Sequence, residues 1–485
     1  MKKVNLFDCC ALLYLYIPII VFSLTWLNWS IGIPVAVICS YFVWRGTLFP
    51  AKFEIKWRQV WPYFVVAVGI IICWALLSGL GGFFAQSYDW QKHNLLLKGF
   101  IDKSWPVRYV YHGKSGVVSY YIAEYLLPGL VGKLAGFNAA QLFLLIWMIL
   151  GLILLVLSIY KWVGVQKGWI LLLIVSALIL FSPFIYPLNG IYATWQPADT
   201  KIMGDIGEWY SKGLKLQYSS NISLLRFVFP QFVPVALSVS LWLQKRKQYQ
   251  CWGILLAPIV LYSTFTFLGL AGVMVLLAVW DLLKDKRTFH WQRVLSVSNL
   301  LAIVVMIVLL LYIACNILQP KPASDSMHLA LIDVWHHKLG FITFQASWII
   351  WVLLLLKCER HNPLLYVAGV MLFILPFFEF GAANDLVMRV SVPALMIINF
   401  LVIKDIALTW RQDLYYAAIL VGGLIIAGAG PLWQLRNAAA HHTIHHQTYN
   451  MPYQTIDEFF HVEKQTVYQY VDWSQSGLRH VLIRK

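Results

Sequence analysis

Charged side chains are scarce in this sequence. Asp, Glu, Lys and Arg make up only 12% of its 485 residues, against about 25% in soluble domains, and 60% of the residues are hydrophobic. This composition excludes a soluble enzyme, an intrinsically disordered chain and a compact nucleic-acid-binding domain. It indicates a polytopic helical membrane protein, in which Trp, Tyr and Phe are abundant enough to form interfacial belts.

Cysteine pairs with the spacing of a disulfide framework or a zinc site are absent. All seven cysteines lie in or beside apolar runs, and none forms a Cys-x-x-Cys pair. We interpret them as small buried apolar residues. Internal repeats and low-complexity linkers between domains are absent as well.

Acidic residues are fewer than basic ones, with 21 Asp and Glu against 37 Lys and Arg. The resulting net charge of +16 comes mainly from short basic connectors between apolar runs. That distribution is typical of cytoplasmic loops and not of a nucleic-acid-binding surface. We therefore expect membrane lipids around the chain and no nucleic-acid partner.

Apolar runs predict the membrane-spanning segments. The run at 251–283 is too long for one span and contains Pro258 and Gly269, so it predicts a tight hairpin of two short helices. A weaker run at 117–135, interrupted at Pro128 and Gly129, predicts two short helices on the membrane surface. The other runs lie near 9–27, 31–44, 60–80, 139–160, 169–187, 228–243, 294–318, 340–357, 363–378, 388–403 and 413–430.

The predicted fold class is therefore all-α. We expect a polytopic integral membrane helical bundle of about thirteen transmembrane helices, with juxtamembrane helices in the first large external loop. A transmembrane domain at 1–430 is followed by a small external C-terminal region at 431–485, where the composition turns polar.

The basic connectors predict the orientation of this bundle. Placing all of them in the cytoplasm gives one consistent topology, with a cytoplasmic N-terminus and an external C-terminus. Most carboxylates then fall on the external side, so we expect any chemistry there. The external loops lie at about 81–138, 188–226, 319–338 and 379–387.

The first external loop concentrates polar residues directly after a span. Asp89, Lys92, His93 and Asn94 lie within six positions. Two interpretations of Asp89 are open: the N-cap of a helix, or a general base at the boundary between lipid and water. An ionisable group at the membrane is by default a candidate functional residue.

Cations elsewhere in the external loops also allow two interpretations. Arg108 and Lys114 lie among Trp and Tyr residues, which suits either interfacial anchoring or the binding of a lipid phosphate. Asp385 and Arg389 are four residues apart and predict an ion pair along a helix start. This pair is either structural, or it orients Arg389 toward a phosphate.

Histidines form two further groups, at His336-His337 and at positions 441–446. Positions i and i+4 of a helix share one face, which is the geometry of zinc ligands. Two interpretations of these histidines are therefore possible: an exposed polar cluster or an adventitious metal site. A divalent metal is thus possible, although the sequence does not imply one.

One part of the chain resembles a known family. The segments Tyr88-Asp89-Trp90 and Pro128-Gly129-Leu130-Val131-Gly132-Lys133-Leu134 are similar to the acidic motif and the later turn in the first external loop of GT-C membrane glycosyltransferases. Protein O-mannosyltransferases and the aminoarabinose transferases of lipid A belong to that superfamily. The likeness covers motifs over 81–135 and architecture over about 60–430. Two extra spans precede the loop, and Trp90 replaces a second acidic residue.

The resemblance implies a function and a set of site residues. It implies transfer of a sugar from a polyprenyl-phosphate-linked donor to a glycan, lipid or protein acceptor, on the external (periplasmic) face of the bacterial inner membrane. Asp89 would be the catalytic base. Other expected site residues bind the donor phosphate (Arg389, Arg108, Lys114 and Arg226) or support the site (Lys92, His93, Asp385 and Glu124).

Two other classes of membrane protein remain as alternatives. An O-antigen polymerase or ligase also has large external loops with arginines. A transporter or flippase of lipid-linked substrates would place polar groups at mid-membrane and often shows repeated halves. The low polar content of the apolar runs disfavours transport.

Overall fold

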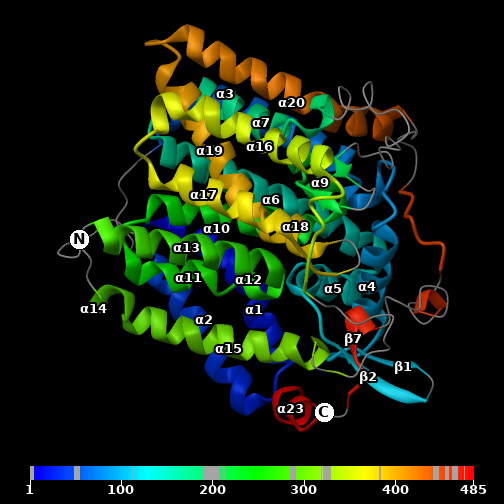
Figure 1. Cartoon of the computed structure of the whole chain (residues 1–485). Helices are drawn as coiled ribbons and strands as arrows, with labels where there is room; N and C mark the ends of the chain where they lie inside the picture. The colour runs from blue at the N-terminus through cyan, green and yellow to red at the C-terminus, as the bar shows by residue number, and fades with distance from the viewer. Residues whose placement is uncertain are drawn as a thin grey trace.

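The computed structural model describes residues 5–47, 55–111, 113–188, 208–210, 214–284, 291–317, 319, 329–381, 384–440, 447–453, 458–460, 468–474 and 476–484. These residues form a bundle of long helices, with smaller elements gathered at one end (Figure 1). The helix α19 (Val392–Thr409) lies inside the bundle and is buried along almost its whole length.

Ten helical segments in the described part are long and apolar enough to cross a membrane. By length and hydropathy the chain is therefore a multi-pass membrane protein, as predicted. The segments are α1 (Leu6–Thr25), α2 (Trp29–Thr47), α3 (Trp57–Leu77), α6 (Phe137–Val163), α7 (Trp169–Leu180, with its apolar helical segment reaching Leu188), α13 (Thr264–Lys284), α15 (Val297–Ile317), α16 (Lys338–Glu359), α18 (Asp385–Val390) continued by α19, and α20 (Leu414–Ala440).

Shorter helices lie between the long ones. Two are apolar: Pro363–Phe377, which contains α17 (Pro363–Ile374), and Tyr249–Tyr262. The predicted total of about thirteen spans depends on counting such short segments and stays a prediction. The remaining short elements are α9 (Asn221–Phe227), α10 (Val233–Gln244), α11 (Trp252–Leu256), α12 (Ile259–Tyr262), α14 (Trp291–Val294), α23 (Gly477–Leu482), η1 (Leu80–Gly82), η2 (Phe229–Gln231), η3 (Tyr249–Cys251) and η5 (Leu375–Phe377).

The run at 251–283 is not a pair of short helices. Pro258 separates α11 from α12, but the chain turns at Ser263, whose backbone is extended, and α13 is one helix of 21 residues. Gly269 lies inside α13 and does not end it. A Cβ atom at Gly269 would lie 2.2 Å from the carbonyl oxygen of Val390, so this glycine permits close helix packing.

The loop predicted to be external at about 81–138 contains two helices, α4 (Trp90–Asp102) and α5 (Ala123–Ala135), but only α5 lies in the run at 117–135 where the sequence predicts two short helices. The expected break at Pro128 is wrong, because α5 continues through it. Pro128 and Gly129 are both buried, and a Cβ at Gly129 would lie 3.1 Å from Phe100. Packing of α5 on α4 and α6 therefore offsets the cost of the backbone hydrogen bond that is lost at Pro128.

Short strands correct the all-α prediction. The hairpin of β1 (Arg108–Tyr111) and β2 (Lys114–Val118) pairs through β2 with β7 (Val471–Asp472), more than 350 residues later. The sequence pattern could not predict this sheet, since its third strand comes from the C-terminal region. Two-residue strands form two further pairs, β3 (Trp209–Tyr210) with β4 (Leu216–Gln217) and β5 (Ala330–Leu331) with β6 (Phe378–Glu379).

The C-terminal region returns to the end of the bundle that carries α4 and α5 (Figure 1). The amide of Thr448 donates to the carbonyl of Gly82 over 2.8 Å. At the far end of the chain Ile483 bridges to Leu27, and the guanidinium of Arg484 lies 3.8 Å from the ring centre of Trp29. The described parts of this region are therefore packed against the bundle.

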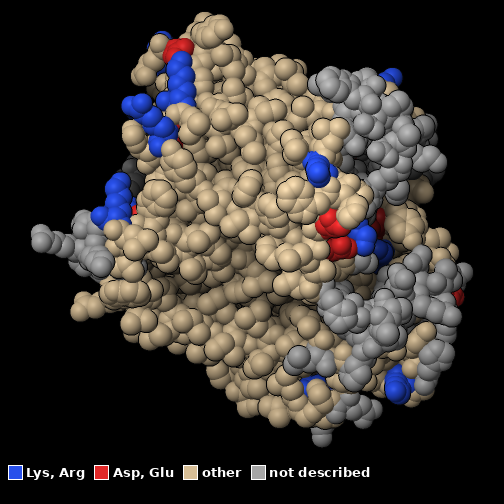
Figure 2. All heavy atoms as spheres, viewed as in Figure 1, with Lys and Arg blue, Asp and Glu red and all other residues tan. Residues whose placement is uncertain are grey.

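Basic connectors gather at the opposite end, where Figure 2 shows Lys and Arg side chains and, between the two ends, a wide surface without charge. Four carboxylates of the described residues at this end are paired with cations, which offsets the cost of burying a charge, while Asp405 accepts a hydrogen bond from the Tyr416 hydroxyl. Asp8, for example, contacts Lys161 over 3.0 Å and Lys245 over 2.5 Å. The other pairs are Asp281 with Arg246 and Lys247, Glu359 with Lys404, and Asp413 with Lys357.

The orientation of the bundle can be tested by cysteine labelling in a cysteine-free background. Lys114 in the β1–β2 turn and Gln412 between α19 and α20 are both exposed and lie at opposite ends. We expect a membrane-impermeant maleimide to label Lys114→Cys in intact cells. Gln412→Cys should react only after the membrane is permeabilised. The reverse pattern would contradict the predicted topology.

Candidate functional site

Asp89 stands at the N-terminus of α4, but its side chain does not cap the helix. Its backbone carbonyl accepts from the amides of Lys92 and His93 over 3.1 and 3.3 Å, whereas the carboxylate makes no capping hydrogen bond. The carboxylate instead lies 3.6 Å from the Lys92 ammonium, and the Asp89 side chain is 36% exposed. The N-cap interpretation therefore fails in its side-chain part, and an accessible carboxylate remains beside a cation.

His93, one turn further along α4, is held from both sides. Its Nε2 lies 2.9 Å from the carbonyl oxygen of Phe227, and its Nδ1 lies 2.5 Å from the Tyr125 hydroxyl. Because a carbonyl can only accept, Nε2 carries the proton and Nδ1 accepts from Tyr125. Burial lowers the pKa of His93, so the ring is neutral near pH 7 and fixes the start of α4 against α5 and α9.

Arg389 forms the ion pair with Asp385 that the sequence predicts. The two side chains approach to 2.9 Å on α18, and both are largely buried. The guanidinium also donates to the Tyr121 hydroxyl over 3.0 Å and lies about 6 Å from the ring centre of Phe265. Arg389 is therefore fixed in position by one carboxylate, one phenol and an aromatic ring.

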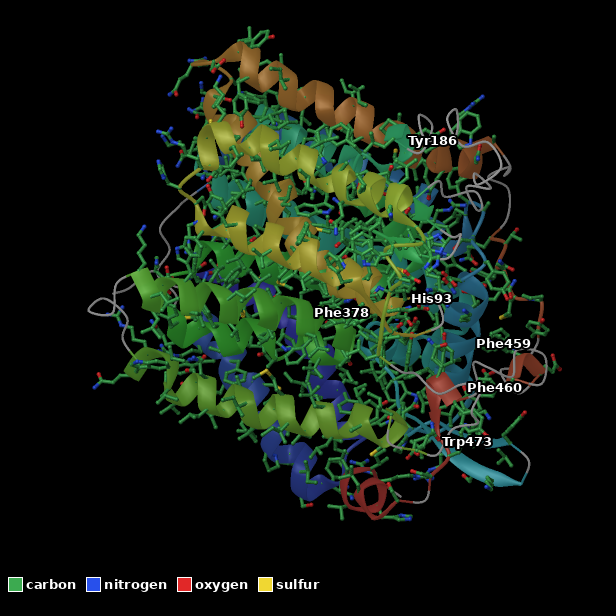
Figure 3. All side chains as sticks on the ribbon, in the orientation of Figure 1. His93, Tyr186, Phe378, Phe459, Phe460 and Trp473 are labelled. Carbon is green, nitrogen blue, oxygen red and sulfur yellow. The ribbon has the colours of Figure 1, made fainter. Side chains whose placement is uncertain are left out.

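Asp89 acts electrostatically on side chains from distant parts of the chain. Burial raises the pKa of Tyr470, and the charge of Asp89 adds to that shift. The Asp89 charge also acts on His93 and on Arg389. Asp89, Lys92 and His93 of α4 and Asp385 and Arg389 of α18 therefore lie within electrostatic range of one another, and we call these five residues the cluster. Figure 3 shows His93 at the end of the bundle where Phe459 and Phe460 of the C-terminal region also lie.

Arg226 lies next to the cluster but points elsewhere. Its carbonyl accepts from the indole of Trp90 over 3.0 Å, which ties α9 to the first residue of α4. Its guanidinium donates to the carbonyl of Leu77 at the end of α3 over 3.1 Å. This arrangement braces the segment that carries Asp89.

Arg108 and Lys114 lie on the β1–β2 hairpin. Arg108 donates to the carbonyl of Arg484 over 2.8 Å and so holds the C-terminal segment. Lys114 is exposed beside the turn at Gly113. No hydrogen bond or ion pair described for either side chain reaches Asp89 or Arg389, so the structure does not bring these two cations to the cluster.

Glu124 is expected on the membrane surface with the other carboxylates of the loops predicted to be external. It lies instead inside the bundle. It is 1% exposed, and neither carboxyl oxygen has a hydrogen-bond partner among the described residues. Burial raises its pKa to about 8, and the neighbouring Trp147 indole offsets only part of that shift. Its charge acts on Tyr14, in the middle of α1, and α5 packs against α1, so Glu124 lies in the interface between these helices.

Three residues near the cluster carry no role in the sequence pattern. Tyr121 follows β2, Gln231 ends η2, and Tyr470 precedes β7. Gln231 donates to the Tyr121 hydroxyl over 3.1 Å, beside Arg389. An isolated Gln or Tyr is a weak signal, and only the tertiary structure places these three side chains together.

Metal binding finds no support in the described part of the chain, where no three His, Cys, Asp or Glu side chains gather in a way that would hold an ion. His336 pairs with Asp333, while the histidines at 441–446 lie outside the described residues. Residues 189–207 and 211–213, most of the second loop predicted to be external, also lie outside the described residues.

The burial of Glu124 predicts a dependence of stability on pH. Its pKa is about 8 in the folded chain against an ordinary value of 4.5, so the folded state keeps a proton that the unfolded state releases. Stability from this group is therefore highest at low pH and falls as pH rises from about 4.5 to 8. Glu124→Gln, which cannot ionise, should lose this dependence.

Melting temperatures of the purified chain in detergent would measure the effect. Relative to the native chain, Glu124→Gln should gain a few degrees between about pH 5 and pH 8. The exposed Asp102→Asn, at the end of α4, serves as the control and should show no such gain. An offset between Glu124→Gln and the native chain that is the same at both pH values would contradict the assignment.

Comparisons of the chain with protein-family models, with curated proteins and with solved structures found no match. Its family is therefore not identified by similarity. What the chain does has to be argued from the cluster around Asp89 and Arg389 and from its place at one end of a helical membrane bundle.

Proposed function

We propose that this protein is a membrane glycosyltransferase of GT-C type. It transfers a sugar from a polyprenyl-phosphate-linked donor to an acceptor on the external face of the bacterial inner membrane. The observation that carries the proposal is the accessible, uncapped carboxylate of Asp89, set beside Lys92 and within the electrostatic reach of Arg389. A base and fixed cations are the two requirements of this reaction.

The proposed reaction is an in-line displacement at the anomeric carbon. Asp89 takes the proton of the acceptor hydroxyl, whose oxygen forms a bond to the anomeric carbon. The bond from that carbon to the phosphate oxygen breaks, and the electron pair leaves with the lipid phosphate. Because attack and departure occur on opposite faces of the sugar, the configuration inverts.

The cations of the cluster would stabilise the departing phosphate. Arg389 is fixed by Asp385 and Tyr121, so little conformational entropy is lost when it meets an anion. Lys92, whose side chain is 25% exposed, adds a positive charge next to the base. His93 acts as a positioning residue, because its two hydrogen bonds fix the helix turn that carries Asp89 and Lys92.

The lipid-linked donor agrees with where the cluster lies. α18, which carries Arg389, continues directly into the membrane-spanning helix α19, and α4 follows closely after α3. A substrate with its lipid tail between the helices and its phosphate at their ends would therefore meet Arg389 at the boundary of the apolar region. A soluble nucleotide sugar has no need of that position.

A transporter or flippase of lipid-linked substrates is the second candidate, and Glu124 is the observation that favours it. A buried, protonated carboxyl group against the middle of α1 is the kind of group that carries protons in transport proteins. A transporter of this kind would lose activity in Glu124→Gln and keep it in Asp89→Asn. The transferase should show the reverse order of sensitivity.

The substitution Asp89→Asn tests the proposal. It keeps the shape of the side chain and removes the base, so transfer should fall by about 10²–10⁴-fold. Asp102→Asn, which changes an exposed carboxylate at the other end of α4, should keep normal transfer. The assay follows radiolabelled sugar from polyprenyl-phosphate sugars into endogenous acceptors in membranes with equal amounts of each variant. Unchanged transfer by Asp89→Asn would remove Asp89 as the base.

A further inference from the structure

A buried phenol, Tyr121, lies between β2 and α5 and contacts two elements, α18 and η2, that meet next to the proposed catalytic cluster. Its hydroxyl receives hydrogen bonds from Arg389 of α18 over 3.0 Å and from the Gln231 amide of η2 over 3.1 Å. Gln231 is fully buried, and Tyr121 is 9% exposed. The three side chains are therefore held in one fixed arrangement.

Two polar atoms of this group have no hydrogen-bond partner among the described residues. They are the Nε of Arg389, which is a donor, and the Oε1 of Gln231, which is an acceptor. Leaving such atoms buried and unpaired costs about 1–3 kcal/mol each, so native proteins usually satisfy them with a ligand or an ordered water. The two belong to side chains that both donate to the Tyr121 hydroxyl, so the unpaired donor and the unpaired acceptor lie on neighbouring groups.

The chemistry of the two atoms selects the kind of group. An alcohol hydroxyl accepts one hydrogen bond and donates another, so it pairs with both Arg389 Nε and Gln231 Oε1. A phosphate or carboxylate offers only acceptors and would leave Oε1 facing a negative charge.

Aromatic rings lie beside this polar group. The ring centres of Tyr120 and Tyr121 are 3.5 Å apart, and those of Tyr120 and Tyr470 are 4.5 Å apart. Tyr470 belongs to the C-terminal region and is held there because its carbonyl accepts from the Ser119 amide over 3.0 Å. Aromatic surface with a few fixed polar groups is the usual lining of a small-molecule site.

The ligand that fits both features is a sugar ring, which has apolar C–H faces and a rim of hydroxyls. We propose that Tyr120, Tyr121, Tyr470, Gln231 and Arg389 form a pyranose-binding subsite, in which one sugar hydroxyl is held between Arg389 Nε and Gln231 Oε1. This rests on the proposed function only for the statement that the bound ring is the reacting sugar. The charge of Asp89 acts on both Tyr470 and Arg389, so the subsite lies within electrostatic range of the proposed base.

The C-terminal region is then part of the binding site. Tyr470 supplies one of the aromatic faces, and β7 next to it is fixed by pairing with β2. An aromatic face in the site is thus completed by a residue almost 350 positions after Tyr121 in the chain.

Saturation-transfer NMR on the full chain in nanodiscs tests the proposal. The probes are the methyl glycosides of glucose, galactose and mannose, whose weak binding this method detects. We expect at least one of them to receive saturation from the protein. Gln231→Leu and Tyr470→Leu should each weaken that binding about fivefold, by loss of one hydrogen bond or one packing surface.

Two further variants make the test specific. Gln231→Glu keeps an acceptor for a hydroxyl but repels an anion, so binding of the glycoside should stay within about twofold of the native chain. Tyr468→Leu changes a partly buried tyrosine of the same segment and should have no effect. Circular dichroism and melting temperature would show which variants are folded.

Several results would overturn the subsite. The first is the absence of saturation transfer to all three glycosides. The second is binding by Gln231→Leu and Tyr470→Leu that is as strong as binding by the native chain. The third is displacement of the sugar by inorganic phosphate together with loss of sugar binding in Gln231→Glu. The last result would indicate an anion site. Sugar binding without any transferase activity would support the subsite while the proposed function failed, so the two proposals can be separated.

Discussion

The exclusion of charge from the middle of the bundle is the constraint on which the rest of the structure depends. A charged side chain in hydrocarbon costs several kcal/mol unless it is paired, so nearly all charges are found at the two ends. At one end Asp8 is neutralised by Lys161 and Lys245 inside the helix ends. At the other end Asp89 stays accessible beside Lys92. The first arrangement is structural, whereas the second leaves a carboxylate available for chemistry.

The same constraint explains how the end near Asp89 is built. Backbone groups outside the helices need partners, and the C-terminal region supplies many of them. Asn450 contacts Gln86 and the carbonyl of Ser87, which is two residues before Asp89, and β7 completes the sheet with β2. The segment that carries the proposed base is thus held by residues that follow the last long helix. For this reason we regard the C-terminal region as part of the proposed site and not as a separate appendage.

Glu124 departs from this sorting of charge, and it shows why a carboxylate in a loop predicted to be external need not lie on the surface. Because α5 begins inside the bundle, its first turn faces α1 and not the solvent. The carboxyl group avoids the cost of a buried charge by keeping its proton, as its raised pKa of about 8 indicates. Its position in the sequence indicates neither the burial nor the protonation.

The sequence by itself determined the features that depend on local pattern: the membrane class, the apolar helices and the Asp385–Arg389 pair at i, i+4. The tertiary structure decided the rest, because it depends on contacts between distant segments. In the structure the Asp89 side chain does not cap α4, and Arg108 donates to the carbonyl of Arg484. Helix α5 continues through Pro128, and Gln231 and Tyr470 lie near Tyr121. Helix periodicity is encoded within a few residues, whereas a site at the meeting of α4, α18 and the C-terminal region exists only after the bundle has packed.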